Sequence, residues 1–225
     1  MAVLEGEGRV PILFGTLSLP VPPNRSAYIA RPDSVGEHAT VVIGHDESGI
    51  TPGLKAVARH LARHGYSAIM PDLVRPATSE DGFEWTVSDL ADAVDSARIP
   101  GTDWASQSQI ALLGVGMGGV AASIVAADEA VGGLILVGAV LDHDLLAAFE
   151  GRLLVLHGTD DEMAPAGEVR GLQESVGRGE WILYSGVASG FFDEGSPDFN
   201  AGAATDARQR TVAFLDDSFR AVPAT

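Results

Sequence analysis

The sequence predicts an α/β fold in which a mostly parallel central sheet is covered by helices on both faces. Short, continuously apolar segments of strand length recur along the chain, as at residues 40–44 and 109–113. Segments with helical spacing of apolar residues lie between them, an alternation typical of parallel strands that are buried on both faces. No long linker rich in proline, glycine or serine interrupts the 225 residues. We therefore expect a single domain over residues 1–225.

The strands can be placed in chain order from these segments. Residues 12–19 and 26–30 come first, and we expect them to form antiparallel strands at one edge of the sheet. Six apolar segments follow and are predicted to be parallel strands: 40–44, 67–70, 109–113, 133–137, 153–156 and 181–184. Because ligand sites in such sheets lie at the C-terminal ends of the strands, the residues after each strand are the candidates for chemistry.

Helices are predicted between the strands. Thr51 is suited to cap the first helix, since Pro52 then takes the first helical position and Gly65 lies where a helix would end. In the second helix, Thr86 and Asp89 are spaced like a capping pair. Further helices are predicted after the glycine-rich turn at 114–119 and around the apolar residues Val212, Leu215 and Phe219.

Composition and charge exclude several classes of function. The 31 acidic and 14 basic residues give a net charge of −17, which repels phosphate backbones and anionic membrane surfaces. Without cysteine the chain can form no disulfide, thiolate metal site or cysteine nucleophile. No apolar run approaches the roughly 18 residues that would span a bilayer, and residues 1–7 do not resemble a signal peptide. We expect a cytoplasmic protein that binds a small molecule, without cofactor, metal, nucleic acid or membrane.

The glycine-rich turn allows two interpretations. Gly114, Gly116 and Gly119 fit the G-x-G-x-x-G pattern that binds a dinucleotide. That pattern needs an acidic residue about 20 positions on, and the nearest candidate is Asp142, 28 residues after Gly114. Alternatively, Gly114 and Gly118 flank Gly116 as in the nucleophile elbow G-x-Nu-x-G, a sharp strand-to-helix turn. We favour the elbow, because two parallel strands already precede this turn.

Four segments of the chain carry motifs in a fixed order. They are 41–73 with its His-Asp-Glu-Ser-Gly loop, 114–119, 157–161 with Pro165 behind it, and 184–192 before the last helix. Together they resemble the dienelactone hydrolase family of α/β-hydrolases, over nearly the whole chain from about residue 26. The resemblance implies the α/β-hydrolase fold and a triad of a Cys or Ser nucleophile, an Asp and a His.

Two of the three triad positions carry other residues in this sequence. By the resemblance, Asp161 corresponds to the aspartate, Gly116 to the nucleophile and Ser189 to the histidine. Glycine has no side chain that could attack a carbonyl, and a serine hydroxyl is not a base near neutral pH. We therefore expect the family's elbow mechanism not to operate.

The loop after the first parallel strand offers replacement groups. The resemblance implies that Asp46 lies where the family carries an acidic residue near its nucleophile. It also implies that this loop supplies an oxyanion-hole amide, which points to Glu47. Two interpretations remain open for His45 and Asp46: both side chains face the pocket, or both cap the loop that follows.

Other candidate groups come from the turns after later strands. The amide of Met117 opens a predicted helix, so it could bind an anion or a polarised carbonyl. Phe191 is expected to line the pocket. Without a histidine partner, Asp161 either serves as a general acid or base or is satisfied by water or by Ser189.

The remaining histidines are assigned no catalytic role. His60 and His64 lie four residues apart on the first predicted helix, where we expect them on the exposed side; a metal-binding pair is the alternative. His157 directly precedes the turn at Gly158, where the resemblance implies a structural histidine.

Three functions are compatible with these residues. The first is a non-hydrolytic enzyme that uses the pocket, Asp46 and Asp161 for an isomerisation, cyclisation or elimination. The second is a pseudoenzyme that only binds a ligand or a partner. The third is a residual ester or lactone hydrolase in which Asp161 or His45 activates water. We favour the first, on the analogy that this fold accommodates varied chemistry.

Overall fold

The computed structural model describes residues 8–21, 24–73, 82–102 and 104–219, and of residues 82–85 only the backbone. The strands are β1 Ile12–Ser18, β2 Ser26–Pro32, β3 Thr40–Gly44, β4 Ser67–Pro71, β5 Ile110–Val115, β6 Gly133–Val137, β7 Arg152–Gly158 and β8 Glu180–Tyr184. The helices are α1 Pro52–Arg63, α2 Gly82–Arg98, α3 Met117–Asp128, α4 His143–Ala148, α5 Ala166–Val176, α6 Ala201–Phe219 and the short 3₁₀ helix η1 Ser189–Phe192.

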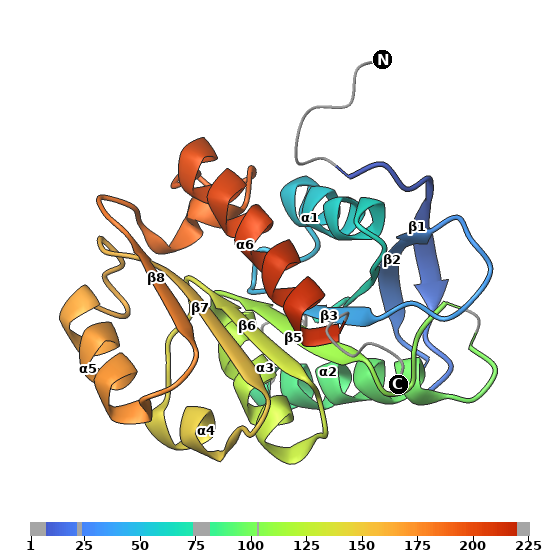
Figure 1. Cartoon of the computed structure of the whole chain (residues 1–225), viewed down its shortest axis with the longest axis horizontal. Helices are drawn as coiled ribbons and strands as arrows, with labels where there is room; N and C mark the ends of the chain where they lie inside the picture. Colours follow the sequence, from blue (N-terminus) through green and yellow to red (C-terminus); the bar gives the residue numbers. More distant parts are fainter. Residues whose placement is uncertain (1–7, 22–23, 74–81, 103, 220–225) are drawn as a thin grey trace.

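The eight strands form one sheet in the order β1-β2-β4-β3-β5-β6-β7-β8 (Figure 1). β1 pairs antiparallel with β2, and β2 antiparallel with β4. The neighbouring strands from β4 to β8 are parallel. The predicted α/β class, with a parallel sheet and antiparallel strands at its N-terminal edge, is therefore confirmed.

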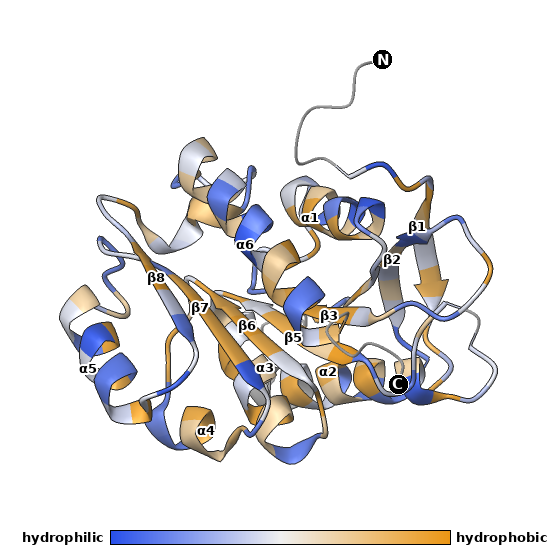
Figure 2. Cartoon of the chain, in the orientation of Figure 1, coloured by the Kyte–Doolittle hydropathy of each residue, from blue (hydrophilic) through white to orange (hydrophobic). Residues whose placement is uncertain are grey.

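Helices cover both faces of this sheet, as predicted. Figure 1 shows α1 and α6 on one face and α2, α3 and α4 on the other. The buried apolar side chains form two clusters, one on each face, and the apolar strands between them appear in orange in Figure 2. One cluster includes Leu54 and Phe214 from α1 and α6, and the other includes Leu90 and Leu146 from α2 and α4.

The start of α1 follows the sequence prediction, whereas the start of α2 does not. Thr51 caps α1, because its Oγ1 accepts a hydrogen bond from the Leu54 amide at 3.0 Å. α2 begins at Gly82, so Thr86 lies inside the helix and does not cap it. Asp89 is 3% exposed and accepts a hydrogen bond from Nε of Arg25 at 3.0 Å. Although Asp89 has the spacing of a capping residue, it lies inside the helix and pairs with Arg25 from a distant segment.

Two helices of the structure, α4 and α5, were not predicted from the sequence. α4 has six residues and a single buried one, Leu146, so it carries no apolar period. Of the residues of α5, only Val169 is buried.

None of the helices within the described ranges has the length and apolar character needed to cross a membrane.

Candidate active site

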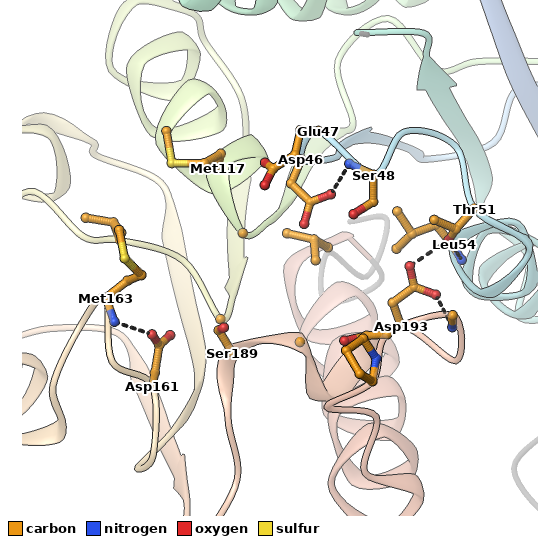
Figure 3. Close-up of a pocket in the computed structure, with 18 residues that line it drawn as sticks. Asp46, Glu47, Ser48, Thr51, Leu54, Met117, Asp161, Met163, Ser189 and Asp193 are labelled. Atoms are coloured by element: carbon orange, nitrogen blue, oxygen red, sulfur yellow. Dashed lines mark hydrogen bonds between the residues drawn. The ribbon is translucent and has the colours of Figure 1, made fainter.

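A cavity of about 380 Å³ lies at the C-terminal ends of the parallel strands. The segments that follow β3, β5, β6 and β7 contribute to it, together with the start of α1 and residues 189–197 (Figure 3). Its volume lies at the lower end of the range of about 300–1,000 Å³ found for small-molecule sites. This is the edge of the sheet at which α/β folds carry their ligand sites.

A sharp turn between β5 and α3 forms one wall of the cavity. Gly116 occupies it with φ 56° and ψ −127°, a conformation that costs a residue with a side chain but suits glycine. Gly118 lets the backbones approach closely, because a Cβ there would lie 2.4 Å from the carbonyl carbon of Gly44. The turn therefore has the strand–turn–helix shape of a nucleophile elbow.

The competing dinucleotide interpretation loses the acidic residue that it needs. Asp142 caps α4 and accepts a hydrogen bond from the Leu145 amide at 3.0 Å. Asp142 does not line the cavity, and its carboxylate serves the backbone of a helix.

The first turn of α3 presents backbone amides to the cavity. Met117 is the first residue of this 12-residue helix, and the first amides of a helix have no acceptor within it. Together with the helix dipole they favour an anion or a polarised carbonyl oxygen. The side chain of Met117 lines the cavity and is 44% exposed.

The carboxylate of Asp46 points toward the elbow. Its Oδ1 accepts a hydrogen bond from the Ser48 amide at 2.8 Å, which fixes the loop after β3. Its Oδ2 lies 3.1 Å from the position that a Cβ on Gly116 would take. Among the described residues no donor is bonded to Oδ2. Asp46 thus brings an open acceptor to the centre of the elbow, and Glu47 lines the cavity beside it (Figure 3).

His45 is separated from the cavity. Its side chain is buried, and the Leu73 amide donates to its Nε2 at 3.2 Å. Nε2 also lies 3.1 Å from the carbonyl oxygen of Pro71, and Nδ1 lies 2.7 Å from the carbonyl oxygen of Asp46. Of the two open interpretations, His45 follows the second and holds the loop, whereas Asp46 faces the cavity. The expectation of a catalytic His45 is not supported by this geometry.

Asp161 lines the cavity but is held by its own turn. It is 5% exposed, and its Oδ1 accepts hydrogen bonds from the amides of Met163 at 2.9 Å and Ala164 at 3.3 Å. Its Oδ2 lies 3.5 Å from Nε2 of His157, which is fully buried and also lies 2.8 Å from the Ala164 carbonyl oxygen. Backbone amides and His157, rather than Ser189, are the neighbours of this carboxylate.

Ser189 and Phe191 lie in η1 and differ in their surroundings. Ser189 lines the cavity, next to Gly138, where an added Cβ would lie 2.2 Å from the Ser189 carbonyl oxygen. Phe191 is fully buried and packs against Tyr184 and Phe192, with ring centroids 5.1 and 6.2 Å away. The expectation that Phe191 contacts a ligand is therefore wrong; it belongs to the core.

This arrangement can be compared with known proteins. A model of the dienelactone hydrolase family matches residues 26–219. The chain belongs to this family. A comparison with curated protein sequences finds no match.

Solved structures share the fold of this family member at low sequence identity. A proposed dienelactone hydrolase from Klebsiella pneumoniae subsp. pneumoniae MGH 78578 has a TM-score of 0.79 and 20% identity, with 91% of this chain and 98% of that one covered. A dienelactone hydrolase-like promiscuous phosphotriesterase from metagenomic libraries has a TM-score of 0.73 and 15% identity, with 92% and 98% covered. These likenesses concern the fold.

The cavity at the C-terminal ends of the parallel strands is therefore the candidate site. The correspondence of Gly116 and Ser189 with the family's nucleophile and histidine stays a prediction, as does a catalytic use of Asp46 or Asp161. The structure brings Asp46, Asp161 and Ser189 to one cavity, from the ends of three elements far apart in the sequence.

Several lining residues carry no sequence signal. Val140 and Met163 follow β6 and β7 and present exposed apolar side chains to the cavity. Asp193 joins the wall through Thr51, whose Oγ1 donates to its Oδ2 at 2.7 Å. A single valine or methionine in a loop forms no recognisable sequence pattern, so only the folded structure identifies it as a residue that lines the cavity.

The histidine pair on α1 lies away from this cavity. The rings of His60 and His64 are 4.4 Å apart, and Nε2 of His60 is buried with no hydrogen-bond partner among the residues that the structure describes. Both side chains are half-buried rather than fully on the exposed side, and His60 lies near Arg208 of α6. Within the described part of the chain, no group of three or more His, Asp or Glu side chains is placed to hold a metal ion.

Proposed function

We propose that this dienelactone hydrolase family member is a non-hydrolytic enzyme that transfers protons on a small carbonyl compound. The reaction would be an isomerisation, cyclisation or elimination. The observation that carries the proposal is the open carboxylate oxygen of Asp46 beside Gly116, at the place where an elbow would otherwise hold its nucleophile.

The proposed base is the Asp46 carboxylate. A general base needs a free acceptor within reach of the substrate, and Oδ2 has no donor among the described residues. Oδ1 is fixed by the Ser48 amide at 2.8 Å, so the free oxygen is held in one direction. Because Gly116 has no side chain, a substrate carbon can approach Oδ2 from the elbow.

The proposed oxyanion site is the amide end of α3. A substrate carbonyl oxygen bound at the Met117 amide would gain negative charge as Asp46 removes a proton from the adjacent carbon. The electron pair of the broken carbon–hydrogen bond forms the enolate. Return of a proton to another carbon completes an isomerisation, and expulsion of a leaving group from the next carbon completes an elimination.

A hydrolytic route has less support. Gly116 offers no nucleophile, and both nitrogens of His45 face backbone groups. Asp161 is engaged by two amides at 2.9 and 3.3 Å, so its Oδ1 is less available to activate water.

The test is solvent deuterium exchange at carbons beside a carbonyl. Proton NMR in D₂O would follow 2-butanone, aminoacetone and pyruvate, which are neutral, cationic and anionic. We expect exchange above the buffer rate for at least one of them, reduced about 100-fold in Asp46→Asn because a general base contributes on the order of 10²–10⁴-fold. Rates at the buffer level for all three, or unchanged in Asp46→Asn, would contradict the proposal.

Two controls separate the alternatives. Asp144→Asn removes a carboxylate that is 98% exposed on α4 and does not line the cavity, and it should leave the exchange rate unchanged. Hydrolysis of 4-nitrophenyl acetate is expected at the background rate. Hydrolysis above background that disappears in Asp161→Asn would instead favour a residual hydrolase.

A further inference from the structure

The charges that line the cavity have one sign. Four carboxylates contribute to its wall, from Asp46, Glu47, Asp161 and Asp193. Among the described residues that line it, none is a lysine, arginine or histidine. In a chain with a net charge of −17, an anionic ligand would meet repulsion both at long range and in the cavity.

The four carboxylates differ in how many hydrogen bonds they already accept. Asp161 is held by two backbone amides, as described above. Asp193 accepts hydrogen bonds from Thr51 Oγ1 at 2.7 Å and from the Gly195 amide at 2.9 Å, and it lies at the start of α1. The charges of both are therefore offset by fixed donors.

Asp46 and Glu47 are left with open acceptors. Oδ2 of Asp46 has no donor, and Glu47 is exposed with no hydrogen bond or ion pair to another described residue. Both lie on the loop after β3, and Figure 3 shows them side by side above the elbow. Two neighbouring carboxylates with open oxygens form a site suited to a cationic group.

Part of the cavity wall is apolar. Met117, Val140 and Met163 line it and are 44%, 36% and 73% exposed. They are three of the seven large apolar side chains that are exposed in the described part of the chain. Figure 3 shows Met117 and Met163 on the same side of the view as Asp161. Exposed apolar side chains gathered at a cavity rather than scattered indicate a surface that a ligand covers.

We propose that this cavity takes a small organic cation, an alkyl- or arylammonium compound. Its charged nitrogen is held by Glu47, beside the negative charge of Asp46, whose Oδ2 faces the adjacent carbon; its apolar part lies against Met117, Val140 and Met163. This inference names the ligand class for the proposed function and rests on the use of the same cavity. It concerns binding, so it can be measured without turnover.

The test compares three ligands that share one apolar chain. Hexylamine, hexanol and hexanoate differ only in a cationic, neutral or anionic head group, and their affinities for the full chain can be measured by calorimetric titration at pH 7. We expect hexylamine to bind at least about tenfold more tightly than hexanol, because a charge-assisted hydrogen bond is about twice as strong as a neutral one. Hexanoate should bind more weakly than hexanol.

Substitutions assign the two ends of the ligand. Asp46→Asn should weaken hexylamine about tenfold and leave hexanol unchanged, and Asp46→Glu should recover much of the loss. Met163→Ser should weaken both ligands. Asp144→Asn should change neither, which excludes a general attraction of cations to an acidic protein. Glu47→Gln provides a second measurement in case Asp46→Asn does not fold.

The proposal is overturned if hexanoate binds as tightly as hexylamine, or if both Asp46→Asn and Glu47→Gln keep the wild-type affinity for hexylamine. Its failure can be told from failure of the proposed function. Hexylamine binding as expected, without deuterium exchange in any of the three carbonyl compounds, would leave the ligand class standing and remove the enzyme. Deuterium exchange that depends on Asp46, without hexylamine binding, would leave the proposed enzyme standing and remove the ligand class.

Discussion

The loop after β3 and the turn after β7 each bring one carboxylate to the same cavity, but they hold it differently. Asp161 is 5% exposed, and two amides and a buried histidine surround it. Asp46 is half-buried and has one oxygen fixed by the Ser48 amide and one oxygen open. A fully engaged carboxylate stabilises its own turn, whereas an open one is available to a ligand. In the proposed function, Asp161 therefore stabilises its own turn, and the loop after β3 provides the base.

The largest expected effect is on stability. Asp161→Ala should lower the free energy of unfolding by about 3 kcal/mol, because it leaves the amides of Met163 and Ala164 without their acceptor. Asp46→Ala should cost at most about 1 kcal/mol, since its single fixed hydrogen bond is exposed. Urea unfolding followed by circular dichroism measures both values. Equal losses would show that the two carboxylates are held alike.

A second prediction concerns the loss of stability at acidic pH. His60 contributes to this loss, so its contribution must be known before the two carboxylates can be compared. Burial, with the positive charges of His64, Arg208 and Arg63, lowers the pKa of His60 from 6.5 to about 4. The unfolded chain then binds this proton at higher pH than the folded protein does. Stability from His60 is therefore present above about pH 6.5 and is lost as the pH falls toward 4.

The size of this effect follows from the shift. We expect a loss of about 2 kcal/mol, less than the full linkage value because water reaches part of the ring. His60→Gln should remove this part of the pH dependence, as measured by urea unfolding at about pH 7, 5.5 and 4.5. His143→Gln changes an exposed ring on α4 and should keep the wild-type slope. A slope that is the same in His60→Gln and the wild type would refute the assignment.

The smallest effect is expected from rebuilding the triad. Gly116→Ser together with Ser189→His should give weak but detectable hydrolysis of 4-nitrophenyl acetate if these are the nucleophile and histidine positions. The gain stays small because the new Cβ lies 3.1 Å from Oδ2 of Asp46 and the turn has a positive φ. We expect the serine to cost about 1 kcal/mol of stability.

This double variant also sharpens the comparison of the two carboxylates. Adding Asp161→Asn should abolish the new hydrolysis, whereas adding Asp46→Asn should leave it unchanged. A folded double variant without any hydrolysis would count against the assignment of Gly116 and Ser189. Hydrolysis that required Asp46 would exchange the roles that we give to the two residues.

Local pattern and family resemblance are enough to predict much of the fold. Continuous apolar segments predict the strands β3 to β8, because strands that are buried on both faces do not need alternating polar residues. Thr51 and Pro52 placed the start of α1, because capping depends on residues adjacent in sequence. The order of glycine motifs placed Gly116 at a turn and Asp161 near it. Short helices with one buried residue, such as α4, lack a period and give no such signal.

Only the tertiary structure decided which side chains meet. His45 and Asp46 are neighbours in sequence, yet one is tied to Leu73 of a distant segment and the other faces the cavity. Phe191 has the sequence position of a pocket residue but packs in the core. Such outcomes depend on contacts between segments far apart in the chain, which residue type and spacing do not encode. Local sequence patterns predict most of the strands and helices and the end of the sheet at which the candidate site lies. Long-range packing sets which carboxylate is fully hydrogen-bonded and which has an open oxygen.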